Sequence, residues 1–262
     1  MNCEPEDPAF QRLKRKLIDS TGLAFYAERD TLLTQVIAAR LAGLGLRDCN
    51  AYAKFLAEGA EGSAEMELLT GQLTIGETYF FRDEDQFAAI RDVILPDILQ
   101  RNRATNELRI WSAGCSTGAE PYSLAILLAD EMAPQIAGWK VSIYASDLNR
   151  SFLAQAAAGK YRASALRATS EQRKRDCFSH QGLVWTLDSR YKERVTFHHL
   201  NLAQSQFPTP WQGGTHLDLI LCRNVMIYFA PEVNRRLIAE FHRPLEVGGW
   251  LVVGASEYSL AR

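Results

Sequence analysis

The chain has 262 residues, 47% hydrophobic and 23% charged, which is an ordinary composition for a globular protein. This length corresponds to one large domain or two small ones, and it can bury a core without disulfide or metal support. The 29 lysines and arginines face 31 aspartates and glutamates, leaving a net charge of −2. Because nucleic-acid-binding domains usually carry a basic excess, we expect no nucleic-acid partner.

The N-terminus and the cysteines predict a cytoplasmic protein. The first residues are acidic and polar, unlike a secretory leader, and no apolar stretch approaches the ~20 residues that cross a bilayer. We therefore expect no membrane insertion. Neighbouring His198 and His199 would point to opposite faces of a strand, which argues against a metal centre. Without a C-x-x-C pair, we expect free thiols in a reducing compartment at all five cysteines: Cys3, Cys49, Cys115, Cys177 and Cys222.

The first hundred residues predict one helix after another and no strand. Apolar residues recur there at the spacing of one helical face. The resulting stripes cover residues 10–18, 32–44, 52–56, 66–73 and 87–94. We assign residues 9–80 to an all-helical N-terminal domain and residues 81–106 to a linker helix.

Several residues in this region are of the types that commonly start or end a helix. Gly22 follows the first stripe and is expected to end that helix. Asp48 or Asn50 can cap the third helix. Asp83, followed three residues later by Gln86, resembles a capping box at the start of the linker helix.

From residue 107 onward, short apolar runs alternate with helical stretches. Such alternation predicts βαβ units and a mostly parallel, Rossmann-like sheet, here spanning residues 107–262. The expected strands are 108–113, 140–146, 195–200, 217–222 and 250–254, and the expected helices are 122–132, 152–157 and 231–245. Residues 160–195 interrupt the pattern. We expect them to form a small α+β insertion with a helix over 170–178 and a hairpin over 183–187 and 191–195.

The first predicted strand ends in a glycine-containing turn, Gly114–Gly118, and a helix follows. Its spacing is not the G-x-G-x-x-G of nicotinamide-binding folds. It matches the G-x-S-x-G turn of serine hydrolases, with Ser116 as nucleophile, and also the nucleoside-binding loop of S-adenosylmethionine (AdoMet) enzymes. The hydrolase interpretation is the weaker one, because Ser116 follows the first strand of the sheet and everything before it is helical. Asp218 and His242 could be nominated to complete a triad, but His242 is expected inside a helix.

Polar residues also follow two other strands, at the edge where ligands of parallel sheets bind. Asp147 ends the second strand and could accept hydrogen bonds from two ribose hydroxyls. Its alternative role, shared with Ser146, is to cap the next helix as an exposed residue. The fourth strand ends abruptly in Arg-Asn, which could place Asn224 and Tyr228 on the floor of a pocket.

These motifs, in this order, resemble those of CheR-type chemotaxis receptor glutamate methyltransferases, which use AdoMet. The resemblance covers nearly the whole chain. The segments that carry it are Leu73–Arg82 (LTIGETYFFR), Trp111–Ser123 (WSAGCSTGAEPYS), Ala145–Asp147 (ASD) and Cys222–Phe229 (CRNVMIYF).

The resemblance implies an AdoMet site with S-adenosylhomocysteine (AdoHcy) as product. Asp147 would hold the ribose, and the residues after the third strand would bracket the adenine. The methionine end would meet the linker and the strand ends, whereas Gly76, where relatives often carry asparagine, would lack one cofactor contact. The implied cofactor-binding residues are Thr78, Arg82, Glu120, Asp147, Asn201, Leu202, Arg223 and Asn224.

The same resemblance implies that Arg82 and Tyr228 position the substrate carboxylate and the methyl group. A glutamate has a pKa of about 4.3, so it is already a nucleophile at neutral pH and requires no general base. Paired donors on Arg82 can orient a carboxylate. The structural alternative for Arg82 is an ion pair with Asp83 or Asp85.

The implied partner is the cytoplasmic helical domain of a methyl-accepting receptor. Basic residues around the first two helices could meet its acidic surface, although charges of this kind are more often simply solvated. The compact hairpin of the insertion lacks a glycine-rich loop, so we expect no tethering to a receptor C-terminal pentapeptide. Relatives continue into a last antiparallel strand, and we expect this chain to be a fragment of a longer protein. The contacts proposed for the receptor come from Arg12, Lys14, Arg15, Lys16, Arg40 and Arg47.

One alternative function is not catalytic. The chain could bind AdoMet and dock on a receptor without turnover. The presence of both Arg82 and Tyr228 favours an enzyme over such a module.

Overall fold

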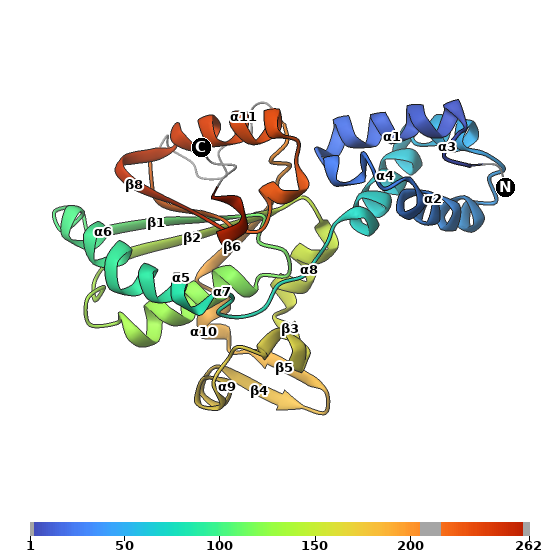
Figure 1. Cartoon of the computed structure of the whole chain (residues 1–262). Helices are drawn as coiled ribbons and strands as arrows, with labels where there is room; N and C mark the ends of the chain where they lie inside the picture. Colours follow the sequence, from blue (N-terminus) through green and yellow to red (C-terminus); the bar gives the residue numbers. More distant parts are fainter. Residues whose placement is uncertain (1–2, 205–215, 259–262) are drawn as a thin grey trace.

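The computed structural model describes residues 3–204 and 216–258, in which a group of helices precedes a parallel sheet (Figure 1). We call α1–α4, together with the short η1, the N-terminal helices. They lie beyond the carboxyl ends of the strands, on the right of the view. Their bounds are α1 Pro8–Thr21, η1 Ala24–Tyr26, α2 Asp30–Leu44, α3 Cys49–Phe55 and α4 Gly59–Leu73.

The N-terminal helices form because each turns an apolar stripe toward a shared core. In α1, Phe10, Leu13 and Leu17 are buried. The helix ends where predicted, since Gly22 adopts the left-handed conformation (φ +78°) that glycine tolerates best. Asp48 caps α3 by accepting a hydrogen bond from a backbone N–H, as the sequence also predicted.

The linker region consists of α5 Glu84–Ala89, the π-helical turn η2 Ile90–Ile94 and α6 Leu95–Arg101. The predicted capping box at its start is wrong. Asp83 has a left-handed backbone (φ +60°), and its side chain makes no capping hydrogen bond. Its carboxylate instead pairs with the guanidinium of Arg223, at 2.9 Å, and Gln86 also binds Arg223. A tertiary ion pair has therefore replaced the local cap.

The prediction of five free thiols is also wrong. Cys3 and Cys49 form a disulfide, with their Cα atoms 5.4 Å apart. Their separation of 46 positions carries no spacing signal, and only the packing of α1 against α3 brings the two cysteines together. Cys115, Cys177 and Cys222 are free thiols and are buried.

The sheet is parallel throughout its described pairs, in the order β6-β2-β1-β7-β8. The predicted alternation is thus confirmed, although the last strand begins five residues earlier than expected. The strands are β1 Glu107–Ala113, β2 Lys140–Asp147, β6 Val195–His199, β7 Leu217–Cys222 and β8 Leu245–Val253. The helices between them are α7 Ala119–Ile126 with the π-helical turn η3 Leu127–Glu131, α8 Arg150–Ala158 and α11 Pro231–His242.

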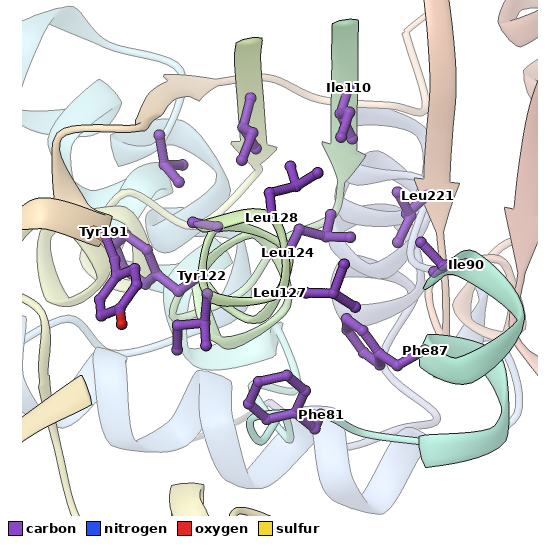
Figure 2. Close-up of a cluster of buried hydrophobic side chains, with 14 of the residues drawn as sticks. Phe81, Phe87, Ile90, Ile110, Tyr122, Leu124, Leu127, Leu128, Tyr191 and Leu221 are labelled. Carbon is purple, nitrogen blue, oxygen red and sulfur yellow. The ribbon is translucent and has the colours of Figure 1, made fainter. Parts of the chain in front are cut away.

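Helices cover both faces of the sheet, giving three layers (Figure 1). The linker helices and α7 pack on one face, where Phe87, Leu124 and Leu127 meet strand residues such as Leu221 (Figure 2). On the other face, α11 packs against the fully buried Trp111, whose ring meets Phe241 edge to face at 5.3 Å. Burial on both faces holds the carboxyl ends of the strands rigidly at one edge.

The insertion predicted at 160–195 is a small three-stranded antiparallel sheet, β3-β5-β4, that projects from the main body (Figure 1). The predicted helix is present as α9, but the predicted hairpin is wrong. β4 pairs with β5 around Gly182, whereas residues 189–192 form a helix because Tyr191 is drawn inward to donate to Asp130, at 2.7 Å. The elements are β3 Lys160–Tyr161, η4 Ala163–Leu166, α9 Glu171–Cys177, β4 Phe178–Gln181, β5 Val184–Leu187 and α10 Ser189–Lys192.

Within residues 3–204 and 216–258, no helix is long and apolar enough to cross a membrane. The same residues contain no cluster of three or more side chains suited to a metal ion. After β8 the described chain continues through η6 Ala255–Glu257. Residues 259–262, where relatives were expected to continue into a further strand, lie outside the described residues.

Candidate active site

A deep cavity lies where the carboxyl ends of the strands face the N-terminal helices. Its empty space, with the open mouth included, is about 1030 Å³. Its walls come from η1, the segment between α4 and α5, and the turns after β1, β2, β6 and β7. Every cofactor-binding and catalytic residue that the resemblance implies lines it: Thr78, Arg82, Glu120, Asp147, Asn201, Leu202, Arg223, Asn224 and Tyr228.

The turn between β1 and α7 brings backbone to the cavity floor. Gly114 (φ +80°) and Gly118 (φ +86°) are left-handed, and a Cβ on Gly114 would lie 2.4 Å from the side chain of Val225. Ser116 is also left-handed, at φ +50°. Glycines here let the main chain approach both a neighbouring turn and a ligand closely. Burial raises the pKa of Cys115 well above its ordinary range, so this thiol stays neutral.

This turn lacks the surroundings of a serine hydrolase. The Ser116 hydroxyl donates to the carbonyl of Gly76, at 3.4 Å, and not to a histidine. Asp218, the nominated acid, pairs with Arg101 at 2.6 Å and lies at the start of β7, at the opposite end of the sheet. His242 is the last residue of α11. The structure therefore does not assemble a triad.

Asp147 occupies the end of β2 as a buried carboxylate, 9% exposed. It accepts hydrogen bonds from the backbone N–H of Ser116, at 2.7 Å, and of Asn149, at 2.8 Å. Its role is not that of an exposed cap, because Asn149 caps α8. Each carboxylate oxygen keeps acceptor capacity for a ligand hydroxyl. Burial raises the pKa of Asp147 above its ordinary value, and the two N–H donors partly oppose this shift.

Arg223 joins the end of β7 to the linker. Its buried guanidinium donates to the carbonyl of Arg82 at 2.6 Å, and it pairs with Asp83 and with Glu120 at 2.9 and 3.1 Å. Its Nε donates to the side chain of Gln86. Most of its donors are thus used within the protein, so Arg223 shapes the cavity more than it offers hydrogen bonds to a ligand. Glu120 is held from the other side by the hydroxyl of Ser112, at 2.7 Å.

Arg82 and Tyr228 face the cavity with unused polar groups. Nη1 of Arg82 donates to the carbonyl of Glu77, at 2.9 Å. Among the described residues, Arg82 makes no ion pair with Asp83 or Asp85, and the hydroxyl of Tyr228 makes no hydrogen bond. Burial raises the pKa of Tyr228, and the nearby Arg82 charge opposes that rise. At neutral pH the Tyr228 hydroxyl therefore keeps its proton and can donate.

The two residues expected to bracket adenine both line the cavity, but their side chains differ in how far they are available to a ligand. Leu202 contributes an apolar wall to the cavity. Asn201 also lines it, but its amide is engaged, because Nδ2 donates to the carbonyl of Ser20, at 2.8 Å, and Oδ1 accepts from Ala203. Asn201 thus ties the turn after β6 to the end of α1.

Asn224 has a left-handed backbone (φ +60°), and its buried side-chain Oδ1 has no hydrogen-bond partner within the described residues. Its turn is held by Glu257, a fully buried residue that the motifs did not single out. The Glu257 carboxylate accepts from the N–H groups of Asn224, Val225, Met226 and Gly254, each at 2.7 Å. No spacing rule links residues 224 and 257. Only a glutamate directly after the last strand could have suggested this role.

Two further features of the cavity were not foreseen from the sequence. The N-terminal helices supply Leu23, Phe25 and Tyr26 to its wall. Phe152 on α8 lines it as well, and a Cβ on Gly76 would lie 2.4 Å from the tip of the Phe152 ring. The aromatic ring therefore occupies the space beside Gly76 that a larger residue at that position would need.

Comparison with known proteins agrees with this geometry. The profile of the family described as "CheR methyltransferase, SAM binding domain" matches residues 76–260. A probable chemotaxis protein methyltransferase from Rhizobium etli is 34% identical, over 92% of this chain and 89% of its own length. The chemotaxis protein methyltransferases of Salmonella typhimurium and Escherichia coli are 33% and 32% identical, over 96% of this chain and 84% of their own lengths. The chain belongs to the CheR family.

As a CheR protein, the chain is an AdoMet-dependent chemotaxis protein methyltransferase. The helical N-terminus, the parallel five-stranded sheet and the small antiparallel sheet agree with the architecture expected from the resemblance. The cavity at the carboxyl ends of the strands is where a sheet of this kind binds its ligand.

Proposed function

We propose that this protein transfers the methyl group of AdoMet to glutamate side chains in the cytoplasmic helical domain of a methyl-accepting receptor. The products would be a glutamate methyl ester and AdoHcy. The observation that carries the proposal is the meeting of Arg82 and Tyr228, both with unused donors, in one cavity with the buried carboxylate of Asp147. These are the groups needed to hold a nucleoside and a second carboxylate together.

The chemistry of the cavity fits AdoMet as the bound cofactor. Asp147 has acceptor capacity left for the ribose hydroxyls, and Leu202 offers an apolar surface to the adenine. Oδ1 of Asn224, buried and without a partner, suits the amino group of the methionine end. Glu120 and Thr78 also line the cavity and are available to the cofactor. When bound, AdoMet supplies an electrophilic methyl group on a sulfonium.

The protein's own contribution to the reaction is positioning. A glutamate carboxylate is ionised at neutral pH and needs no base. Arg82 can hold this carboxylate through paired N–H donors. The protonated Tyr228 hydroxyl can donate one more hydrogen bond to it and so fix its orientation. Methylation removes one receptor charge, a local electrostatic change that a helical signalling domain can transmit.

We infer that the receptor approaches over the N-terminal helices. Two of the cations expected to contact it are already engaged, because Lys14 pairs with Asp30 and Arg40 binds the buried Glu65. They stabilise the helices and offer little charge to a partner. The cations that remain exposed for an acidic receptor surface are Arg12, Arg15, Lys16 and Arg47.

The first test measures cofactor binding. Calorimetric titration with AdoMet and AdoHcy should give saturable one-site binding, and Asp147→Ala should abolish it because the ribose loses its acceptors. Methyl transfer to receptor-containing membranes should then be lowered at least tenfold in Tyr228→Phe, with AdoHcy affinity unchanged. Tyr258→Phe, an exposed tyrosine away from the cavity wall, is the matched control. Binding without transfer by the wild type would instead support a docking module.

A further inference from the structure

The segment after α1 reaches from the N-terminal helices into the wall of the cavity. Gly22 lies so close to the turn after β6 that a Cβ there would be 2.2 Å from the Cβ of Ala203. The hydrogen bond from Asn201 to the carbonyl of Ser20 also holds the end of α1 against the turn after β6. The chain then turns through η1, which places Phe25 on the cavity wall.

Phe25 is held firmly within η1. The guanidinium of Arg29 lies 3.9 Å from the centre of the Phe25 ring and donates to the Phe25 carbonyl, at 2.7 Å. The neighbouring Tyr26 donates its hydroxyl to the carbonyl of Leu73, at 2.9 Å, where α4 ends. These contacts make η1 a rigid part of the N-terminal helices.

The ring of Phe25 meets the ring of Tyr228 edge to face, with centroids 5.8 Å apart. The backbone of the turn that carries Tyr228 is fixed from the sheet side, since the N–H of Met226 donates to Glu257 and its carbonyl accepts from Asn234. The Tyr228 side chain, however, packs against the core of the N-terminal helices. Its hydroxyl has no partner within the described chain. The direction of the ring therefore depends on its aromatic contact.

We propose that Phe25 is a positioning residue for methyl transfer, which holds the Tyr228 ring so that its hydroxyl points at the reacting carboxylate. The inference rests on the proposed function. It assigns one wall of the active site to the N-terminal helices, so correct docking of these helices becomes a condition for the reaction. Phe25 acts through Tyr228 and needs no contact with the transferred methyl group.

The test compares Phe25→Ala with Phe55→Ala in the full chain. Phe55 is a half-buried phenylalanine of α3 that does not line the cavity, so it matches Phe25 in size and region. For Phe25→Ala we expect kcat to fall about tenfold, equivalent to ~1.4 kcal/mol of transition-state stabilisation. AdoHcy affinity should stay within about twofold, because the ribose and adenine contacts are untouched. Phe25→Leu should recover part of kcat, and Phe25→Ala combined with Tyr228→Phe should be no slower than Tyr228→Phe alone.

Three outcomes would overturn the inference while leaving methyl transfer by the wild type intact. One is an unchanged kcat in Phe25→Ala. Another is an equal loss of kcat in Phe55→Ala, which would indicate a general loss of stability. The third is additive losses in the double variant with Tyr228→Phe, since residues acting through one group should not add. Absence of transfer by the wild type would instead refute the proposed function.

Discussion

Left-handed backbone at non-glycine residues gathers around the active site. Phe81, Asp83, Ser116 and Asn224 all have φ between 50° and 60° and lie in the segments that form the cavity, whereas Asn106 is in a remote turn before β1. Such conformations cost energy and persist where the surroundings enforce them. At Asn224 the surroundings are visible, because Glu257 accepts from the N–H of this residue and holds the turn. Asn224 lines the cavity, and its buried Oδ1 has no partner within the described residues.

We predict that Asn224→Gly lowers AdoHcy affinity about tenfold, the loss of roughly one hydrogen bond. Glycine keeps the left-handed backbone, so the thermal midpoint should change little. Asn106→Gly is the control, because this exposed asparagine has a similar φ of 53° and lies outside the cavity. Calorimetry and thermal unfolding of both variants check the prediction. An unchanged affinity in Asn224→Gly would show that the side chain does not contact the cofactor.

The positions of the site residues could be predicted to a large extent, and their contacts could not. Parallel strands bring their carboxyl ends to one edge, so Asp147 and Asn224 had to lie near the glycine turn. The partners of Arg223 and of Asn201 depend instead on how the linker and the end of α1 pack, which no local pattern encodes. The failed capping box at Asp83 has the same cause.

At the scale of elements, the short turn η6 supports the turn after β7. Glu257 accepts four backbone N–H bonds, two on each carboxylate oxygen. These bonds order the backbone that carries Asn224 and that continues into the short turn η5 (Met226–Tyr228), which carries Tyr228. A carboxylate suits this task because both of its oxygens accept, whereas a glutamine amide would turn an N–H₂ group toward two of the donors.

We therefore predict that Glu257→Gln destabilises the protein by about 2–4 kcal/mol, from two buried N–H groups left without acceptors. AdoHcy affinity and kcat should fall with it, since the turn that carries Asn224 is disturbed. Glu232→Gln, an exposed glutamate in the first turn of α11, should change stability by less than about 0.5 kcal/mol. Urea unfolding measures both variants. Equal midpoints would mean that the turn does not need the carboxylate.

Helices and strands were predicted well where the hydrophobic periodicity was strong. The prediction was poor where it depended on which strands or which cysteines pair. The stripe of α1 and the apolar run of β7 are both present as expected. The hairpin of the insertion was displaced because its residues carry no clear alternation, and the burial of Tyr191 against Asp130 favours a helical turn at α10. The Cys3–Cys49 bond likewise follows from helix packing and not from cysteine spacing.

At the scale of the whole molecule, a few polar contacts join the N-terminal helices to the sheet and its helices. Asn149 is central among them. Its Oδ1 caps α8, while its Nδ2 donates to the carbonyl of Gly71, at 3.1 Å, and to the hydroxyl of Thr74, at 2.7 Å. Its backbone N–H also binds Asp147. One residue thus connects the carboxylate proposed for ribose binding to the end of α4.

We predict that Asn149→Asp weakens this docking. Aspartate retains the cap acceptor but cannot donate to Gly71 or Thr74, and a carboxylate beside the Gly71 carbonyl is repelled. Scanning calorimetry should show the N-terminal helices of this variant unfolding ahead of the sheet, whereas we expect the wild type to unfold in one transition. AdoHcy should restore a single transition, because a ligand that binds across both parts favours the docked form.

The control for this prediction is Asn50→Asp, which introduces the same charge in α3, where Asn50 accepts a hydrogen bond from Arg12 within the N-terminal helices. That variant should unfold in one transition with or without ligand. A single transition in Asn149→Asp as well would mean that apolar contacts such as Phe25 with Tyr228 suffice for docking. Two transitions that AdoHcy leaves separate would instead place cofactor binding on the sheet alone, with no energetic link to the helices that we expect to receive the receptor.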